Sequence, residues 1–249
     1  LLTASIAILN YSNPFNIQAD YVAGHSLGEY SALVAAGVLP FEDAVYAVKK
    51  RGEYMDQAVP AGQGAMSAVL GMSAEELEKV TAKVSDEGNS VQLANLNCPG
   101  QIVISGTAEG VEKASALAKE NGAKRAIPLV VSGPFHSELM KPAAHKFQDV
   151  LSQLSFQDAS IPVIANVTAK PVKDSKEMKD LLVKQLYSPV RWEESVRTMI
   201  ENGVTTFIEV GPGKVLTGLV KKIDRSATIH NVFDLESLQA TVEKLKEEQ

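Results

Sequence analysis

Short apolar segments alternate with helix-like segments along most of the chain, and this alternation limits the fold more than any other sequence feature. The segments that are typical of buried strands include residues 21–23, 161–165, 206–210 and 228–232. Strands that are separated by helices usually pair in parallel, because a parallel connection has to cross over the sheet. The sequence therefore predicts an α/β fold whose sheet is largely parallel.

Residues 62–131 show a different order of elements. The pattern predicts a strand at 65–70, a helix from a capping box of Ser73 and Glu76 to Val84, strands at 91–94 and 101–105 joined by a turn at 97–100, a helix at 109–119 and a strand at 126–131. The order β-α-β-β-α-β is that of a ferredoxin-like module. We therefore predict a small ferredoxin-like domain of residues 62–131, inserted into a larger domain formed by 1–61 and 132–249.

The larger domain is expected to continue with a helix at 136–154, since Leu139, Ala143, Phe147 and Val150 recur on one helical face. Its other helices are predicted at 1–10, from the glycine at 28 to 36, from 40 to about 60, and at 178–185, 192–202, 215–223 and from 236 onward.

The charge balance and the single cysteine exclude several classes of function. Lys and Arg number 24 against 30 Asp and Glu, which gives a net charge of −6. A net-acidic chain without a basic stripe is not expected to bind nucleic acid or an anionic membrane as its main activity. Cys98 has no second cysteine to pair with, so the chain is expected in the reducing cytoplasm. No apolar run reaches the roughly 18 residues that a membrane-spanning helix requires.

Residues 24–28, with the sequence Gly-His-Ser-Leu-Gly, fit the pattern G-x-S-x-G and follow the strand predicted at 21–23. In a nucleophile elbow the serine lies on a sharp strand-to-helix turn, and the glycines permit close approach of the neighbouring backbone. The hydroxyl then stands at the positive end of a helix, where the next backbone N–H can face a developing oxyanion. Ser26 is therefore a candidate nucleophile, and the alternative is a tight turn with an inert serine.

A serine hydroxyl needs a general base, and the chain has four histidines. His25 lies inside the motif, where its side chain is expected to point away from the serine hydroxyl. His145 in a helix and His230 in a strand are expected to have solvated or core roles. His136 ends the loop 132–135, and catalytic groups usually emerge from loops at strand ends, so it is the candidate base. No acidic residue stands out as the third member of a triad.

Several longer segments follow one another along nearly the whole chain. They are GHSLGEYSAL at 24–33, RG at 51–52, NCPGQ at 97–101, PFHS at 134–137, LMKP at 139–142, QLYSPVRW at 185–192 and EVGPGKVL at 209–216. In this order they resemble the malonyl-CoA:acyl carrier protein transacylases of bacterial fatty acid synthesis, a family that includes the acyltransferase domains of polyketide synthases. The resemblance implies an α/β-hydrolase-like parallel-sheet domain with an inserted ferredoxin-like (βαββαβ) small domain.

The resemblance also implies an acyltransferase that works by a ping-pong mechanism in fatty acid biosynthesis. Ser26 would attack the thioester of malonyl-CoA and become malonyl-serine, and the phosphopantetheine thiol of acyl carrier protein would then take the malonyl group. By family match His136 is the base, and the backbone carbonyl of Gln185 holds its ring, so that a Ser-His dyad takes the place of a triad. No permanently bound cofactor and no metal are implied.

The resemblance further assigns substrate contacts. Arg51 is expected to grip the free carboxylate of the malonyl group through two charge-assisted hydrogen bonds, and its alternative is a surface arginine on a solvated helix face. The N–H of Leu27 is expected in the oxyanion hole, and the ring of Phe135 is expected to leave no room for a methyl branch. Asn97 and Asn166 lie near family-matched segments; Asn97 is a candidate substrate contact, although stabilisation of turns is the favoured interpretation of both side chains.

Members of the family usually begin several dozen residues further upstream, with a strand and a Gly-Gln-Gly loop that supplies a second oxyanion N–H. This sequence starts at Leu1, after that region, and the letters Gly-Gln-Gly at 62–64 stand at the entry to the predicted inserted domain, so the role is not transferred to them. We expect the chain to lack the first strand and loop. Losing one oxyanion donor typically costs about 10²–10³ in turnover, so poor activity is expected of the chain as given.

Two other interpretations share these residues. A serine thioesterase or esterase would use the same serine and histidine but let water take the acyl group, and a catalytically silent docking domain would keep the serine without its chemistry. Acyl carrier proteins are strongly acidic, so a local basic patch is expected to receive them, with Lys214, Lys221, Lys222 and Arg191 as candidates. The chain is expected to be a monomer.

Overall fold

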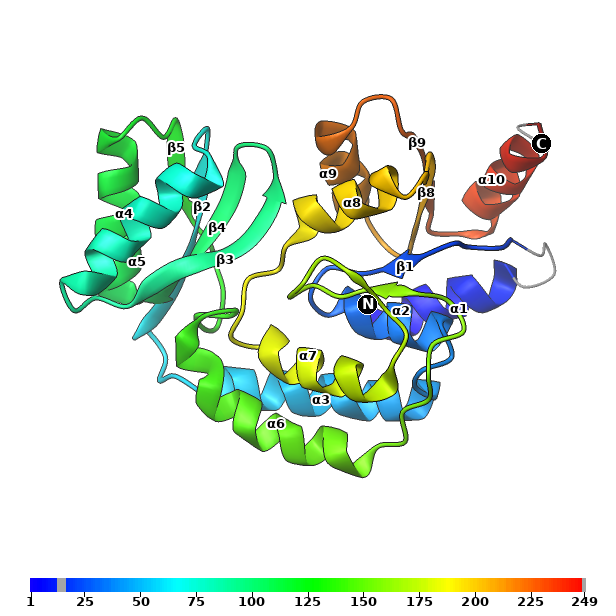
Figure 1. The fold of residues 1–249 in the computed structure, drawn as a ribbon, viewed down its shortest axis with the longest axis horizontal. Helices are drawn as coiled ribbons and strands as arrows, with labels where there is room; N and C mark the ends of the chain where they lie inside the picture. Colours follow the sequence, from blue (N-terminus) through cyan, green and yellow to red (C-terminus); the bar gives the residue numbers. More distant parts are fainter. Residues whose placement is uncertain (13–16, 248–249) are drawn as a thin grey trace.

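The computed structural model describes residues 1–12 and 17–247 and shows an α/β fold (Figure 1). The elements follow one another as α1 (Leu2–Ser12), β1 (Val22–Ala23), α2 (Gly28–Ala35), α3 (Phe41–Gln57), β2 (Gly64–Leu70), α4 (Ala74–Asp86), β3 (Val91–Cys98), β4 (Gln101–Thr107), α5 (Ala108–Glu120), β5 (Arg125–Pro128), η2 (Glu138–Met140), α6 (Lys141–Gln153), β6 (Val163–Ile164), β7 (Pro171–Val172), α7 (Ser175–Gln185), α8 (Trp192–Glu201), β8 (Thr206–Val210), α9 (Val215–Ile223), β9 (Thr228–Val232) and α10 (Leu235–Glu247).

The elements from β2 to β5 form a four-stranded sheet in the order β3-β4-β2-β5, and every pairing in it is antiparallel. Figure 1 shows α4 and α5 together on one side of this sheet. Between helices and sheet lies a separate apolar core that includes Val69, Leu77, Ile104, Ala114 and Ala118. The order of strands and helices in this segment is the one that the sequence predicts.

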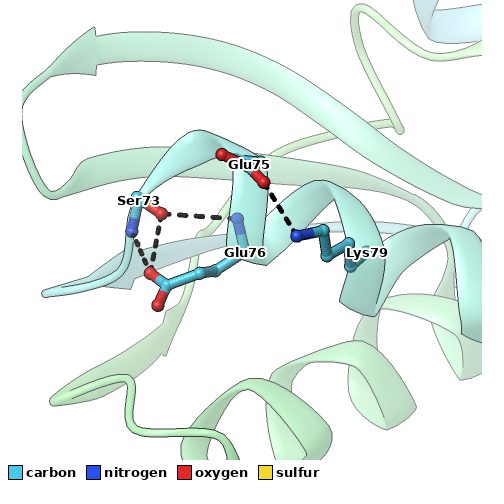
Figure 2. A network of polar contacts seen from close by, with 4 residues as sticks. All are labelled: Ser73, Glu75, Glu76 and Lys79. Atoms are coloured by element: carbon cyan, nitrogen blue, oxygen red, sulfur yellow. Dashed lines mark hydrogen bonds and ion pairs between the residues drawn. The ribbon is translucent and has the colours of Figure 1, made fainter.

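The capping box at the start of α4 is present as predicted (Figure 2). The Oγ of Ser73 accepts a hydrogen bond from the backbone N–H of Glu76 at 3.3 Å, and an Oε of Glu76 accepts one from the N–H of Ser73 at 3.0 Å. Two backbone donors that the first turn of a helix leaves free are thereby satisfied. Leu77, Val80 and Val84 then follow at helical spacing on the buried face.

The strands outside this segment form two small sheets rather than one largely parallel sheet. β1 pairs in parallel with β6, and β6 pairs antiparallel with β7; β8 and β9 form a separate parallel pair. The prediction is therefore correct for the parallel pairs and wrong for β7, which was not expected. β1 and β6 lie within apolar runs, whereas β7 consists of an exposed proline and a buried valine, so the sequence carries no signal for it.

The helices α2, α3, α6 and α7 surround the largest apolar core, and Figure 1 places α3, α6 and α7 side by side below β1. Its fully buried large side chains include Tyr30, Leu33, Phe147, Leu151 and Leu182. The length and apolarity needed to cross a membrane are found in no helix of the residues described.

Prolines explain two differences between predicted and observed boundaries. The helix expected at 136–154 begins at Lys141, after the short η2 turn, because Pro142 has no N–H to donate and fits only the first turn of a helix. The strand expected at 126–131 ends at Pro128, and Val130 beyond it is fully exposed. Since α6 begins later than predicted, His136 lies in a loop instead of at a helix start.

The segment between α7 and α8 contacts the antiparallel sheet of β2 to β5. The N–H of Leu96 in β3 donates to the carbonyl of Val190 at 2.9 Å, and the N–H of Val190 donates to the carbonyl of Ala94 at 2.8 Å. These bonds add a parallel bridge between Val190 and Asn95 at the β3 edge of the sheet. The residues between α7 and α8 are thereby held against β3.

We expect Ser73→Ala to lower the free energy of unfolding by ~1 kcal/mol, because the first turn of α4 loses its side-chain acceptor. Urea denaturation, together with amide hydrogen exchange in α4, measures the loss. Lys79→Ala is the matched control, since Lys79 joins Glu75 in an exposed ion pair on the same helix (Figure 2) and should cost less. Equal losses in the two variants would contradict the role of the cap.

Candidate active site

Ser26 lies on the turn between β1 and α2, where its backbone has a φ of 51°. A positive φ is uncommon for a residue with a side chain and costs ~1–3 kcal/mol, so the surrounding structure has to hold it. Gly24 lets the turn close, because a Cβ atom there would lie 2.0 Å from the carbonyl carbon of Gly28. The turn thus has the sharp geometry that the glycine pattern predicts.

His136 comes from the loop between β5 and η2 and is buried beside Ser26. Its Nε2 lies 2.8 Å from the Oγ of Ser26, and its Nδ1 lies 2.8 Å from the backbone oxygen of Gln185. A carbonyl only accepts, so Nδ1 carries the proton and Nε2 accepts from the serine hydroxyl. The structure therefore brings together the three residues that the sequence analysis connects.

Arg51 lies on the buried face of α3, in line with Ala44 and Ala47, and it is 6% exposed. This placement excludes a surface arginine on a solvated helix face. Its Nη2 donates to the Oγ of Ser26 at 2.8 Å and to the Oε1 of Gln185 at 3.0 Å. Its Nε is buried and meets no acceptor among the described residues. The guanidinium thus retains unused donor capacity next to the serine.

The electrostatics of the site follow from burial. The pKa of His136 is lowered to about 3, first because burial disfavours the charged imidazolium and second because Arg51 is positive nearby. The ring is therefore neutral at ordinary pH. Burial raises the pKa of the Glu29 carboxyl to about 7, while its hydrogen bond from Gln185 and the charge of Arg51 lower it.

Asn166 was expected to stabilise a turn, and it does so at the Ser26 turn, far away in the sequence. Its Oδ1 accepts a hydrogen bond from the backbone N–H of Ser26 at 2.7 Å, and its Nδ2 donates to the carbonyl of Gly24 at 2.7 Å. These bonds hold the residue with positive φ and the glycine two positions before it. Sequence patterns report local neighbours, so no signal pointed from Asn166 to this turn.

The sequence analysis missed Glu29 and the side chain of Gln185. Glu29 lies on the buried side of α2 with Ala32 and Leu33, and it is 4% exposed. Its spacing from these apolar residues was the available signal, because an acid three and four positions before buried residues shares their helix face. The side-chain amide of Gln185 is fully buried between Glu29 and Arg51.

Asn97 lies in β3, whereas the sequence predicted it in a turn. Its Oδ1 lies 2.8 Å from the Nε2 of His25, whose ring also packs on Trp192 with 5.7 Å between centroids. β3 extends through Cys98, so Asn97 lies in a strand and not in the predicted turn at 97–100, and its side chain contacts His25 at the Ser26 turn. His25 points toward this asparagine, as expected of a side chain directed away from the serine hydroxyl.

The remaining candidates take different positions. Phe135 is half-buried and packs against both the large helical core and the cluster of Met66 and Ala94. The N–H of Leu27, at the start of α2, makes no backbone hydrogen bond to the residues that the structure describes. No group of three His, Cys, Asp or Glu side chains with the spacing of a metal site occurs in residues 1–12 and 17–247.

The basic residues proposed for partner binding are not equally free. Arg191 is paired with Glu194 through two hydrogen bonds, so its charge is partly used within α8 and its preceding residue. Lys222 donates to the side chain of Gln101 at 3.1 Å, which leaves two further donors on its ammonium group. Lys214 and Lys221 are exposed around α9.

Comparison with known proteins covers the same residues. The model of the acyl transferase domain family matches residues 3–246. The malonyl CoA-acyl carrier protein transacylase of Bacillus subtilis (strain 168) is 64% identical over 248 residues, which are 100% of this chain and 78% of that protein. Among solved structures, the malonyl CoA-acyl carrier protein transacylase from Coxiella burnetii superposes with a TM-score of 0.96 at 41% identity, covering 98% of this chain and 78% of that one.

A second solved structure shows a malonyl-transacylase in complex with a type II PKS acyl-carrier protein. It superposes with a TM-score of 0.94 at 44% identity and covers 98% of this chain and 79% of that one. The family model and these relatives extend over the whole site described above, from the Ser26 turn to Gln185. The chain belongs to the acyl transferase domain family.

Proposed function

We propose that this protein transfers the malonyl group from malonyl-CoA to the phosphopantetheine thiol of acyl carrier protein. The observation that carries the proposal is the buried guanidinium of Arg51, which donates a hydrogen bond to the hydroxyl of Ser26. The same hydroxyl donates to the imidazole of His136. A buried cation next to a serine nucleophile fits an acyl group that ends in a carboxylate. The relatives named as malonyl transacylases, and the one solved with a carrier protein, support the same assignment.

In the first half-reaction the Oγ of Ser26 attacks the thioester carbonyl of malonyl-CoA, and its proton passes to the Nε2 of His136. The C–S bond then breaks, and the sulfur of CoA leaves with the proton from His136. In the second half-reaction the carrier thiol gives its proton to His136, and its sulfur attacks the malonyl ester. The Ser26 oxygen leaves with that proton, which restores the enzyme.

The remaining groups support these steps. We expect the positive end of α2 and the N–H of Leu27, which makes no backbone hydrogen bond to the described residues, to stabilise the negative charge that develops on the carbonyl oxygen. The carbonyl of Gln185 holds the imidazole in the tautomer that can accept the serine proton. No acidic third residue is required for this arrangement, because the backbone carbonyl of Gln185 accepts the hydrogen bond from the Nδ1–H of His136.

Phe135 and Asn97 are proposed to shape the acyl site. The ring of Phe135 precedes His136 and packs against two apolar clusters, and we expect it to leave no room for a methyl branch on the acyl group. Asn97 acts through His25, whose ring it fixes beside the Ser26 turn. A single methyl contact is worth only ~1–3 kcal/mol, so this selection is weaker than the selection by charge.

We also propose a domain assignment and a docking surface. Residues 1–61 and 132–249 form an α/β-hydrolase-like domain, and residues 62–131 form an inserted ferredoxin-like domain, as the sheet order β3-β4-β2-β5 supports. The acidic carrier protein docks near α9, where Lys214, Lys221 and Lys222 gather on one short segment. The protein acts as a monomer.

The transfer itself is tested by mixing the protein with labelled malonyl-CoA and phosphopantetheinylated acyl carrier protein. We expect a malonyl adduct on Ser26 by mass spectrometry, and transfer to the carrier that is faster than hydrolysis of malonyl-CoA. Ser26→Ala is the control and should form no adduct. Hydrolysis without transfer would show a thioesterase instead, and absence of an adduct on the unaltered protein would show a silent docking domain.

We expect Arg51→Ala to lower kcat/KM for malonyl-CoA by about a hundredfold, because the carboxylate loses charge-assisted hydrogen bonds in a buried site. Acetyl-CoA has no carboxylate, so its relative rate should rise. Arg51→Lys keeps a charge but not the planar fork, and should fall between the two. An unchanged preference for malonyl-CoA in Arg51→Ala would refute the clamp.

The lowered pKa of His136 predicts how serine reactivity depends on pH. An uncharged fluorophosphonate should label Ser26 at an undiminished rate as the pH falls through 6.5, the ordinary histidine value, because the base becomes protonated only at much lower pH. Arg51→Gln removes the nearby positive charge and should shift the acidic limb upward. Labelling that halves near pH 6.5 in the unaltered, folded protein would contradict this electrostatic account.

A further inference from the structure

Glu29 is a buried acidic residue that the proposed reaction does not use. Its Oε2 accepts a hydrogen bond from the Nε2 of Gln185 at 2.6 Å and one from the backbone N–H of Asn166 at 3.4 Å. It is joined to Arg51 through the amide of Gln185, since the Oε1 of that amide accepts from the Nη2 of Arg51. A buried carboxyl is costly to keep, so its contacts call for an explanation.

The contacts of Gln185 determine which way its amide points. Its Nε2 faces three acceptors: the Oε2 of Glu29 at 2.6 Å, the carbonyl of Ser26 at 3.1 Å and the Oδ1 of Asn166 at 3.4 Å. Its Oε1 faces the guanidinium of Arg51 at 3.0 Å. In the opposite orientation an N–H would face a guanidinium donor and an oxygen would face a carboxylate. The shortest of the three contacts is with Glu29.

We propose that Glu29 is a positioning residue that acts through Gln185 to hold the guanidinium of Arg51 against Ser26. It thereby strengthens the preference of the site for acyl groups that carry a carboxylate. This inference rests on the proposed function, because it deepens the role given there to Arg51.

The indirect link has a physical advantage over a direct ion pair. A carboxylate in direct contact with Arg51 would occupy donors of the guanidinium that the substrate carboxylate needs. The interposed amide of Gln185 offers a single acceptor, and it leaves the Nε of Arg51 without a partner among the described residues. Burial raises the pKa of Glu29 to about 7, and the hydrogen bonds from Gln185 and Asn166 and the charge of Arg51 oppose this rise; either protonation state keeps an oxygen that can accept from Gln185.

The test compares three substitutions of Glu29 by their kcat and KM for acylation of Ser26 with malonyl-CoA and with acetyl-CoA. Glu29→Met removes the acceptor, Glu29→Asp keeps the charge but shortens its reach, and Glu29→Gln keeps an acceptor at the same reach. We expect the Met and Asp variants to raise KM for malonyl-CoA about tenfold to a hundredfold, as for a lost hydrogen bond to a charged group. Their acetyl-CoA constants should change much less.

Glu29→Gln should restore the malonyl preference to within a few-fold of the original, because the amide oxygen can accept from Gln185. Thr81→Ala, which removes a buried hydroxyl in α4, a helix that packs on the separate core of the antiparallel sheet, is the matched control and should leave the ratio of the two substrates unchanged. Equal losses for both substrates in the Asp variant, or a Gln variant as impaired as the Asp variant, would overturn the proposal. The Asp variant carries the test even where the Met variant fails to fold.

A second substitution tests the chain of contacts. Gln185→Met removes the amide and keeps the backbone carbonyl that binds His136, so it should show the same selective loss for malonyl-CoA. The double variant with Glu29→Asp should lose no more of the malonyl preference than the more impaired of the two single variants, since both residues act through the same contacts. Fully additive losses would overturn the proposal. Failure of the proposed function is separate: the unaltered protein would then form no malonyl adduct on Ser26, or would hydrolyse malonyl-CoA without transfer to the carrier.

Discussion

The site depends on Gln185, because both ends of this residue hold a reactive group. Its backbone oxygen accepts from the Nδ1 of His136, and its side-chain oxygen accepts from Arg51. Its side-chain nitrogen donates to the carbonyl of Ser26 and to Glu29. The base His136, the cation Arg51 and the turn that carries the nucleophile Ser26 are therefore all hydrogen-bonded to a single residue at the end of α7. Its amide is fully buried and hydrogen-bonded at both polar atoms, which keeps the residue in place, and a displacement of it would disturb all three groups.

Two strained backbone positions meet at this residue's hydrogen bonds. Ser26 and His136 have φ values of 51° and 59°, in a region of backbone conformation that is unfavourable for residues other than glycine. The bonds from Asn166 hold the first turn, and the bond from the N–H of His136 to the carbonyl of Leu186 holds the second. In these two backbone conformations the hydroxyl of Ser26 and the imidazole of His136 lie 2.8 Å apart, although the two residues are 110 positions apart in the chain.

Elements with strong local patterns could be predicted from the sequence. The capping box of Ser73 and Glu76, the strands β8 and β9 and the helix α9 lie where the pattern places them, because caps and side-chain periodicity act within a few residues. The weak patterns failed. The two-residue β7 has no periodicity, and the helix at α6 was extended too far because its apolar spacing continues through the turn before Pro142.

The sequence by itself determined the chemistry that is carried by local order: a serine between glycines after a strand, and a histidine at the end of a loop. The resemblance to a family added Arg51 and the backbone carbonyl of Gln185. The tertiary structure alone decided which groups Glu29 and Asn166 bind, because their partners lie 137 to 156 positions away. Hydrogen bonds between such distant residues leave no periodic trace along the chain, since the fold and not the spacing brings their atoms together.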